Sequence, residues 1–261
     1  LKHMNLKEKF FDLFNLYVEK KTKKKDIARV LKNLLPYKTG HELIRLGEDN
    51  DGGYLIPNDI SGIKKNYSAG VGNLSQFEKD LEKKFLIFSN MVDLNEVDEG
   101  ILPRKSKFLK RKISLISSRE ELSINDWLDN EKDEVIFKMD IEGDEYLTLS
   151  SISDENMNKI RVLIVEIHDL RHLRNYFFFK TFDKVFTKLK KSFYICHLHA
   201  NNSSKITNIG GFDIPDMLEL TLIRKNRVKN FKSEFSKLPN ALDQKTVLNK
   251  KEIYIDKKWY S

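Results

Sequence analysis

The chain has 261 residues, of which 40% are hydrophobic and 33% are charged, and this composition excludes a disordered polypeptide. Its one cysteine, Cys196, excludes an intrachain disulfide, so a reducing compartment such as the cytoplasm is expected. No apolar run approaches the roughly 20 residues that span a bilayer, so no transmembrane segment is expected. The formal net charge of +8 comes with scattered lysines and no nucleic-acid-binding motif. A solvated basic surface is therefore favoured, and no nucleic-acid partner is expected.

The amino-terminal 40 residues carry two apolar stripes at helical spacing, which predict two helices within residues 5–35. The first stripe is Phe10, Phe11, Leu13, Phe14 and Val18, and the second is Ile27, Val30, Leu31 and Leu34. We interpret residues 1–40 as a helical extension that could mediate homo-oligomer contacts, with residues 1–3 before Met4 as a cloning remnant. Residues 41–261 are interpreted as the main domain.

From residue 41 onward, short apolar runs alternate with helical stretches. Strands are predicted at 66–70, 85–88, 113–116, 134–139, 162–167, 192–199 and 217–224. Helices are predicted at 74–84, at 123–128, from about 144 onward, and at 172–191. This alternation predicts an α/β fold with a mostly parallel sheet and helices on both faces. In such sheets, ligands bind beyond the carboxyl ends of the strands.

A glycine-rich turn, Gly70–Asn73, follows the first predicted strand, and glycines there let the backbone approach a ligand closely. The dinucleotide-binding pattern would place a third glycine where Ser75 stands. The second strand is expected to end at Ser89-Asn90, with Asp93 too far along to stand at its tip. A simple tight turn remains an alternative for the glycines.

The segment Gly47–Tyr54 resembles a calcium-binding loop at first sight. The fit fails, because Gly47 stands where the first acid should be and Asn58 stands where the closing glutamate should be. A hairpin turn is the alternative, since Asp-Gly is a strong turn signal.

Four acidic residues follow the fourth predicted strand within the stretch FKMDIEGDEY. Asp140 is the first polar residue beyond the strand and is expected to face the ligand crevice, with Glu142 beside it. Asp144 and Glu145 are expected to serve the helix start, where each acid gains about 0.3–1 kcal/mol from the helix dipole.

Further polar residues stand at the ends of the next two strands. Alternation places Glu166 and His168 on one face, and His197 and His199 on one face. Together they could form a metal site of histidine and carboxylate ligands. Polar residues are common at strand ends, however, and no metal is predicted.

These pieces, in this order, resemble the FkbM-type methyltransferases, and the Asp-Gly-Gly-Tyr block resembles a subset of that family. The match covers roughly residues 41–256. The blocks that carry it are Arg45-x-Gly47, Asp51-Gly52-Gly53-Tyr54, Tyr67-Ser68-x-Gly70-x-Gly72, Phe77-Glu78, Lys138-x-Asp140-Ile141-Glu142-Gly143-x-Glu145, Val165-Glu166-x-His168, His199-x-Asn201-Asn202 and Glu219-Leu220-Thr221.

The resemblance implies a Rossmann-like, seven-stranded methyltransferase sheet that binds S-adenosylmethionine. The residues expected to bind the cofactor are Asp51, Gly52, Gly53, Tyr54, Gly70, Gly72, Asn73, Asn90 and Asp140. Those expected to bind the methyl acceptor are Glu142, Glu166, Asn201 and Asn202. Related sequences carry an acid at the second strand tip for the ribose hydroxyls, where this sequence offers Ser89-Asn90.

The activity expected from the resemblance is O-methylation of a sugar hydroxyl or a phosphate-type oxygen, in surface-polysaccharide or capsule biosynthesis. The acceptor would be a small molecule or a nucleotide-linked or glycan-linked group. A sugar hydroxyl must lose a proton, and we expect His168 to be the base, with His199 as its rival and Asp140 beside the reacting methyl. A nicotinamide-dependent oxidoreductase and a basic nucleic-acid-binding module are the alternatives.

Overall fold

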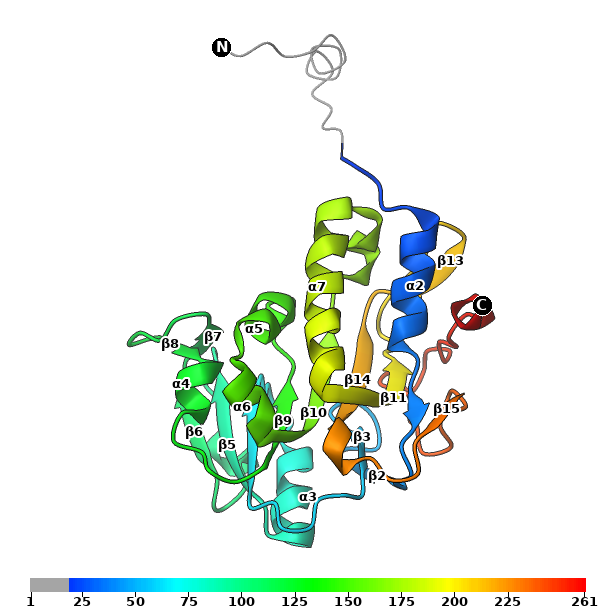
Figure 1. The fold of residues 1–261 in the computed structure, drawn as a ribbon. Helices are drawn as coiled ribbons and strands as arrows, with labels where there is room; N and C mark the ends of the chain where they lie inside the picture. The colour runs from blue at the N-terminus through cyan, green and yellow to red at the C-terminus, as the bar shows by residue number, and fades with distance from the viewer. Residues whose placement is uncertain (1–18) are drawn as a thin grey trace, which may run out of the picture.

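The computed structural model describes residues 19–261 (Figure 1), so the first predicted helix, residues 10–18, lies outside the described residues. Its centre is a seven-stranded sheet with the strand order β11-β14-β10-β9-β4-β5-β6. The strands are β4 (Lys65–Ala69), β5 (Phe88–Asp93), β6 (Lys107–Lys110), β9 (Val135–Met139), β10 (Ile160–Ile167), β11 (Phe193–Ala200) and β14 (Leu218–Arg224).

Most neighbours in this sheet are parallel. Strand β4 is parallel to β5 and β9, β5 is parallel to β6, and β9 is parallel to β10. Strand β14 is antiparallel to both β10 and β11. The chain moves outward from β4 through β5 and β6, and then returns to the other side of β4 with β9. The mostly parallel sheet is thus confirmed, and its order reverses between β4 and β9, which is where a ligand crevice is expected.

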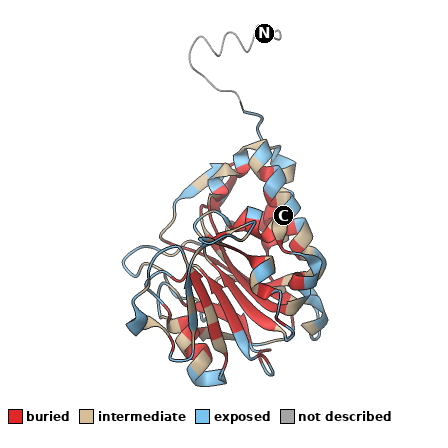
Figure 2. Cartoon of the chain, turned by 90° about the vertical axis from the view of Figure 1, so that its left-hand side faces the viewer, coloured by how far each residue is buried: buried red, intermediate tan, exposed pale blue. Residues whose placement is uncertain are grey.

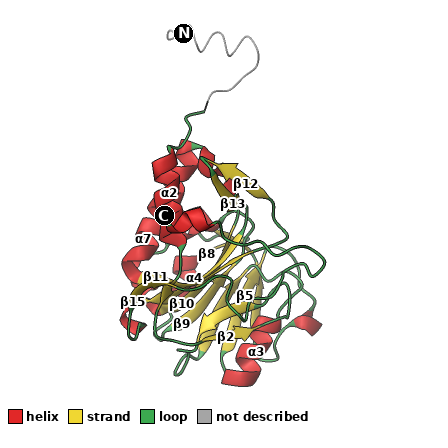
Figure 3. Cartoon of the chain, turned by 90° about the vertical axis from the view of Figure 1, so that its right-hand side faces the viewer, coloured by secondary structure: helices red, strands yellow, loops and turns green. Residues whose placement is uncertain are grey.

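Layers of unequal thickness cover the two faces of the sheet (Figures 2 and 3). One face packs against α2 (Lys24–Leu34), α4 (Ile124–Leu128), α5 (Glu145–Ser151), α6 (Asp154–Lys159) and α7 (Tyr176–Ser192). The other face packs against α3 (Gln76–Phe85) and a hairpin of β2 (Leu43–Leu46) and β3 (Tyr54–Pro57). Strand alternation explains the split, because Phe137 and Ile136 of β9 belong to opposite cores.

Helix α2 corresponds to the second predicted stripe, and all four apolar side chains of that stripe are buried. They belong to the same hydrophobic cluster as the sheet strands. The guanidinium of Arg29 also donates two hydrogen bonds, of 2.8 and 3.0 Å, to the carboxylate of Asp183 on α7. This helix therefore shares the core of the sheet.

Three predicted boundaries are wrong. Strand β5 begins at Phe88, because the apolar residues before it finish helix α3, whose cap Leu86 is left-handed with φ 57°. The third sheet strand is the lysine-rich edge strand β6, while residues 112–114 form β7, which pairs with β8 (Glu121–Ser123) outside the main sheet. Helix α7 begins at Tyr176, where the side chain of Asn175 caps it by accepting two backbone N–H bonds.

The remaining elements are short. Two small sheets pair β1 (Tyr37–Lys38) with β15 (Lys232–Phe235) and β12 (Ile206–Ile209) with β13 (Phe212–Pro215). The 3-10 turns are η1 (Glu99–Ile101), η2 (Leu170–Arg174), η3 (Lys225–Arg227) and η4 (Lys257–Tyr260). None of the helices in residues 19–261 is both long and apolar enough to cross a membrane.

Candidate functional site

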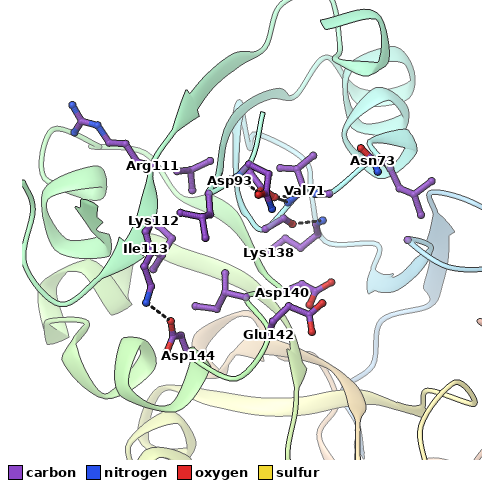
Figure 4. Close-up of a pocket in the computed structure, with 18 of the residues that line it drawn as sticks. Val71, Asn73, Asp93, Arg111, Lys112, Ile113, Lys138, Asp140, Glu142 and Asp144 are labelled. Carbon is purple, nitrogen blue, oxygen red and sulfur yellow. Dashed lines mark hydrogen bonds and ion pairs between the residues drawn. The ribbon is translucent and has the colours of Figure 1, made fainter. Parts of the chain in front are cut away.

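A cavity of about 380 Å³ lies at the carboxyl ends of β4, β5 and β9, where the strand order reverses (Figure 4). Its volume is within the range of small-molecule sites. The predicted site residues that line it are Asp51, Gly52, Tyr54, Gly70, Gly72, Asn73, Asp140 and Glu142. The lining residues that were not predicted to bind a ligand are Val71, Leu74, Val92, Asp93, Leu94, Asn95, Arg111, Lys112, Ile113, Lys138, Ile141 and Asp144.

The glycine turn after β4 brings two strand ends into contact. Gly70 has φ +76°, and a Cβ there would lie 1.6 Å from the carbonyl oxygen of Asp140, so only glycine allows this approach. A Cβ on Gly72 (φ +54°) would meet no atom within 4 Å. The turn is therefore closed against β9 at Gly70 and open at Gly72.

Asp93 is the last residue of β5 and stands at the strand tip, so the expectation that this tip lacks an acid is wrong. Its Oδ2 accepts hydrogen bonds from the backbone N–H of Val71 (2.8 Å) and Gly72 (3.0 Å), and its Oδ1 accepts one from Asn95 (2.8 Å). Asn90, expected at the tip, lies in mid-strand and does not line the cavity. The stretch FSNMVD already indicated an acid at the strand tip, since Asp93 follows its last apolar pair, Met91-Val92.

The predicted hairpin turn between β2 and β3 forms part of the cavity wall, and its Gly52 lies close to Leu74, which follows the glycine turn. Arg45 holds it by donating hydrogen bonds to the carbonyl oxygens of Glu48 (2.8 Å) and Asn50 (3.1 Å). Asp51 and Gly52 line the cavity, but Gly53 does not. Burial raises the pKa of Asp51.

Lys138 is a buried lysine within the otherwise apolar strand β9, and it had no predicted role. Its Nζ lies 3.4 Å from Oε1 of Glu78 on α3 and donates a 3.4 Å hydrogen bond to the carbonyl of Gly70. Ser68 donates a 2.6 Å hydrogen bond to the same Glu78 oxygen, and the Lys138 ammonium lies 5.4 Å from the ring centroid of Tyr54. This network ties the glycine turn, β9 and α3 together beneath the cavity.

The acidic stretch after β9 divides into two groups. As expected, Glu145 serves the helix start: it is buried and accepts backbone hydrogen bonds from Ile141 (3.2 Å) and Gly143 (3.0 and 3.1 Å). Asp144 makes no side-chain capping bond and pairs instead with Lys112 at 3.1 Å on the cavity wall (Figure 4).

His168, at the end of β10, joins this cluster from the neighbouring strand. Its Nδ1 lies 3.0 Å from Oε1 of Glu145. Its Nε2 lies 3.5 Å from Oε2 of Glu142 and 3.9 Å from Oδ1 of Asp140. One ligand atom from each of Asp140, Glu142 and His168 lies within 4.8 Å of the other two.

Burial and neighbouring charge shift two pKa values in this cluster. Burial raises the pKa of Asp140 to about 6, against the opposing charges of Lys138 and His168. Burial alone lowers the pKa of His168, but its hydrogen bond with Glu145 and the carboxylates of Glu145, Glu166 and Asp140 raise it to about 9. At neutral pH the imidazole is therefore protonated.

The other predicted acceptor and base residues form a separate buried layer and do not line the cavity. Asn201 donates a 2.8 Å hydrogen bond to Glu166, and burial raises the pKa of Glu166 well above its ordinary value. His199 lies 3.4 Å from Glu219 and 3.3 Å from Glu252.

Asn202 holds the carboxyl-terminal segment. Its Oδ1 accepts a 2.8 Å hydrogen bond from the N–H of Val247, and its Nδ2 donates one of 2.9 Å to the carbonyl of the same residue. These bonds anchor residues 247–251 against the end of β11.

Comparison with known proteins gives little further identification. No family model and no curated protein matches the chain. Seven solved chains match, and one of these is the human methyltransferase 10 domain containing protein, at 9% identity and a TM-score of 0.36, covering 76% of this chain and 80% of that chain. A similarity this low does not establish a shared fold or function.

Proposed function

We propose that this chain is an S-adenosylmethionine-dependent O-methyltransferase of the FkbM type, with a Rossmann-like sheet and the cofactor site in the cavity between β4 and β9. The main support is Asp93, a carboxylate at the tip of β5 beside the glycine turn. A carboxylate has about four acceptor positions, and three here are taken by backbone N–H groups. One position is left for a ribose hydroxyl.

The charge of the cavity fits a cationic ligand. Acids outnumber bases among its lining residues, which include Asp51, Asp93, Asp140, Glu142 and Asp144 against Arg111, Lys112 and Lys138. The cofactor carries a positive sulfonium and an ammonium group, and an acid-rich wall attracts both. We assign the methionine portion to the side of the cavity formed by Asp51, Gly70 and Asp140.

The same residues argue against a nicotinamide dinucleotide. A pyrophosphate would need the backbone N–H groups of the glycine turn as donors. Those of Val71 and Gly72 already bind the Asp93 carboxylate, whose negative charge would repel a phosphate. The oxidoreductase alternative is therefore disfavoured.

Methyl transfer requires the chain mainly to position the reactants and less to activate them. When bound, S-adenosylmethionine supplies a methyl group on a sulfonium, which is a good leaving group. The chain must hold the acceptor oxygen in line with that group, and we assign this to the end of the cavity at Asp140 and Glu142. We propose a sugar hydroxyl or phosphate-type oxygen of a surface-polysaccharide precursor as the acceptor, as the sequence resemblance implies.

A phosphate-type oxygen is already anionic, but a sugar hydroxyl must lose a proton. The predicted base, His168, carries a proton at neutral pH, because the surrounding carboxylates raise its pKa to about 9. Its Nε2 faces Asp140 and Glu142, which line the cavity, whereas His168 itself does not line it. Deprotonation of a sugar hydroxyl therefore needs another group at this place.

A thermal-shift panel with S-adenosylhomocysteine, NADH and duplex DNA tests the proposal. A ligand that binds only the folded state at 100 times its Kd adds about 2.7 kcal/mol to the free energy of unfolding. We expect S-adenosylhomocysteine alone to raise Tm. A rise with NADH or DNA, but none with S-adenosylhomocysteine, would contradict the proposal.

The acceptor is identified by incubating the chain and isotope-labelled S-adenosylmethionine with cell extracts. Mass spectrometry should find the label as an O-methyl group on a sugar or phosphate-type oxygen. Label found only on nitrogen, sulfur or carbon would refute the O-methylation.

A further inference from the structure

Three side chains with metal-binding atoms converge at the end of the cavity, from the turn after β9 and the end of β10. They are Asp140, Glu142 and His168, and the carboxylates of the first two lie beside each other in Figure 4. We propose that these three residues bind a divalent cation such as Mn²⁺.

The separations between the ligand atoms are close to those that a single ion requires. Two ligand atoms that are each about 2.1 Å from one ion are about 3.4 Å apart at a tetrahedral angle. The Nε2 of His168 lies 3.5 Å from Oε2 of Glu142 and 3.9 Å from Oδ1 of Asp140. The side chain of Glu142 is 85% exposed, so it can rotate to close the remaining gap.

The buried polar atoms of the cluster also point to a missing partner. The Oδ1 atom of Asp140 is inaccessible to solvent, and no residue in the described part of the chain donates a hydrogen bond to it. Buried acceptors are rarely left in this state. The imidazole of His168 is only 8% exposed, and its Nε2 points at this same atom from 3.9 Å.

Glu145 gives His168 the orientation found in metal sites. It is fully buried, accepts backbone hydrogen bonds from the turn, and contacts Nδ1 of His168 at 3.0 Å. A metal-binding histidine almost always donates its other ring N–H to such a carboxylate or carbonyl, which directs the free nitrogen at the ion. Nε2 is left as the ligand atom here, and a bound ion would displace the proton that Nε2 carries in the metal-free chain.

The charge of the cluster favours a cation as well. Three carboxylates, those of Asp140, Glu142 and Glu145, surround one imidazole. Lys138 is directed to Glu78 and to the carbonyl of Gly70. The negative charges of the three carboxylates outnumber the single positive charge of the imidazole, and a divalent ion would balance the excess.

The ligand set indicates the kind of ion and its use. One imidazole and two carboxylates suit Mn²⁺ or Zn²⁺ better than Ca²⁺, and three protein ligands leave positions open for a substrate. If the proposed methyl transfer holds, an ion here would lower the pKa of an acceptor hydroxyl and take the role predicted for a histidine base.

The test titrates MnCl₂ alone into the chelator-treated full chain and follows binding by calorimetry and Mn²⁺ electron paramagnetic resonance. We expect one site per chain, weakened at least about 10-fold by Glu142→Gln. Because Glu142 is exposed, its substitution should not disturb the fold, so misfolding would not explain a loss of Mn²⁺ binding. Equal Tm values for the variant and the wild type would check this. Asp144→Asn is the matched control, since Asp144 lies on the same turn and pairs with Lys112.

Two results would overturn the inference: a wild-type chain that binds no Mn²⁺, or variants Glu142→Gln and Asp144→Asn that bind it equally well. Titration without cofactor separates this from the proposed function. A chain that binds S-adenosylhomocysteine but not Mn²⁺ refutes only the cation site. A chain that binds Mn²⁺ but not S-adenosylhomocysteine supports the cation site and contradicts the methyltransferase proposal.

Discussion

Replacing Asp93 by asparagine tests the assignment of the strand-tip carboxylate to the ribose. Asparagine keeps the shape of the side chain and one acceptor oxygen, which can still bind the N–H groups of Val71 and Gly72. Its amide NH₂ then replaces Oδ1, the atom with the free acceptor position. Asn95 donates to that atom from an exposed site, where water can replace the lost bond, so the fold should survive.

The expected effect on binding follows from the loss of charge. A hydrogen bond to a charged group contributes about 1.5–3 kcal/mol, and one between neutral groups contributes about 0.5–1.5 kcal/mol. The midpoints of these ranges differ by about 1.2 kcal/mol, which corresponds to about an 8-fold increase in Kd for S-adenosylhomocysteine. The same substitution should also lower Tm of the free chain, because the N–H groups of Val71 and Gly72 then bind a neutral oxygen, so binding is compared at a temperature where the variant is folded.

Isothermal titration calorimetry with S-adenosylhomocysteine measures this change. Asp98→Asn is the matched control, because Asp98 lies in the segment after β5, caps η1 through a bond to Gly100, and does not line the cavity. An Asp93→Asn variant that binds as tightly as the wild type would refute the ribose assignment. If both substitutions weakened the binding of S-adenosylhomocysteine equally, the ribose assignment would be refuted too, because the effect would not be specific to Asp93.

Two further predictions concern stability. Gly70→Ala should lower Tm far more than Gly62→Ala, because both positions have positive φ but only Gly70 faces a backbone oxygen at 1.6 Å; similar Tm values would refute the close approach. Folding raises the pKa of His199 from 6.5 to about 9, so its stabilisation is complete below pH 6.5 and is lost as pH rises through 9. This contribution of His199 to the free energy of unfolding amounts to about 3 kcal/mol. The variant His199→Gln should therefore lose the pH dependence that urea unfolding shows for the wild type. A variant with the same pH dependence as the wild type would refute this role of His199.

The local patterns were sufficient for the central elements. Strand β10 is buried at all eight positions, and its apolar run already predicted a strand at 162–167. The apolar stripe of α2 and the helix predicted at 123–128, which is α4, were likewise predicted correctly from local pattern. Each depends on residues within a few positions of one another, which is why the sequence suffices. The edge strand β6 has no buried residue, so its pattern carried little signal.

The site needed long-range information. Asp93 stands at the tip of β5 because the strand runs from Phe88 to Asp93, while the apolar residue Phe85 before it belongs to helix α3. Lys138 contacts Glu78, and His168 contacts Glu145, because β4, β9 and β10 are neighbours in the sheet.

By itself, the sequence determined most of the central strands and the longer helices, and it placed Asp140 and His168 near strand ends, since periodicity is a local effect. The tertiary structure decided which of those residues meet. Strand order and register set these contacts through packing between distant segments, so they separated the cavity residues from the buried layer around His199. They also brought Asp140, Glu142 and His168 within 4.8 Å of one another, from the ends of two adjacent strands.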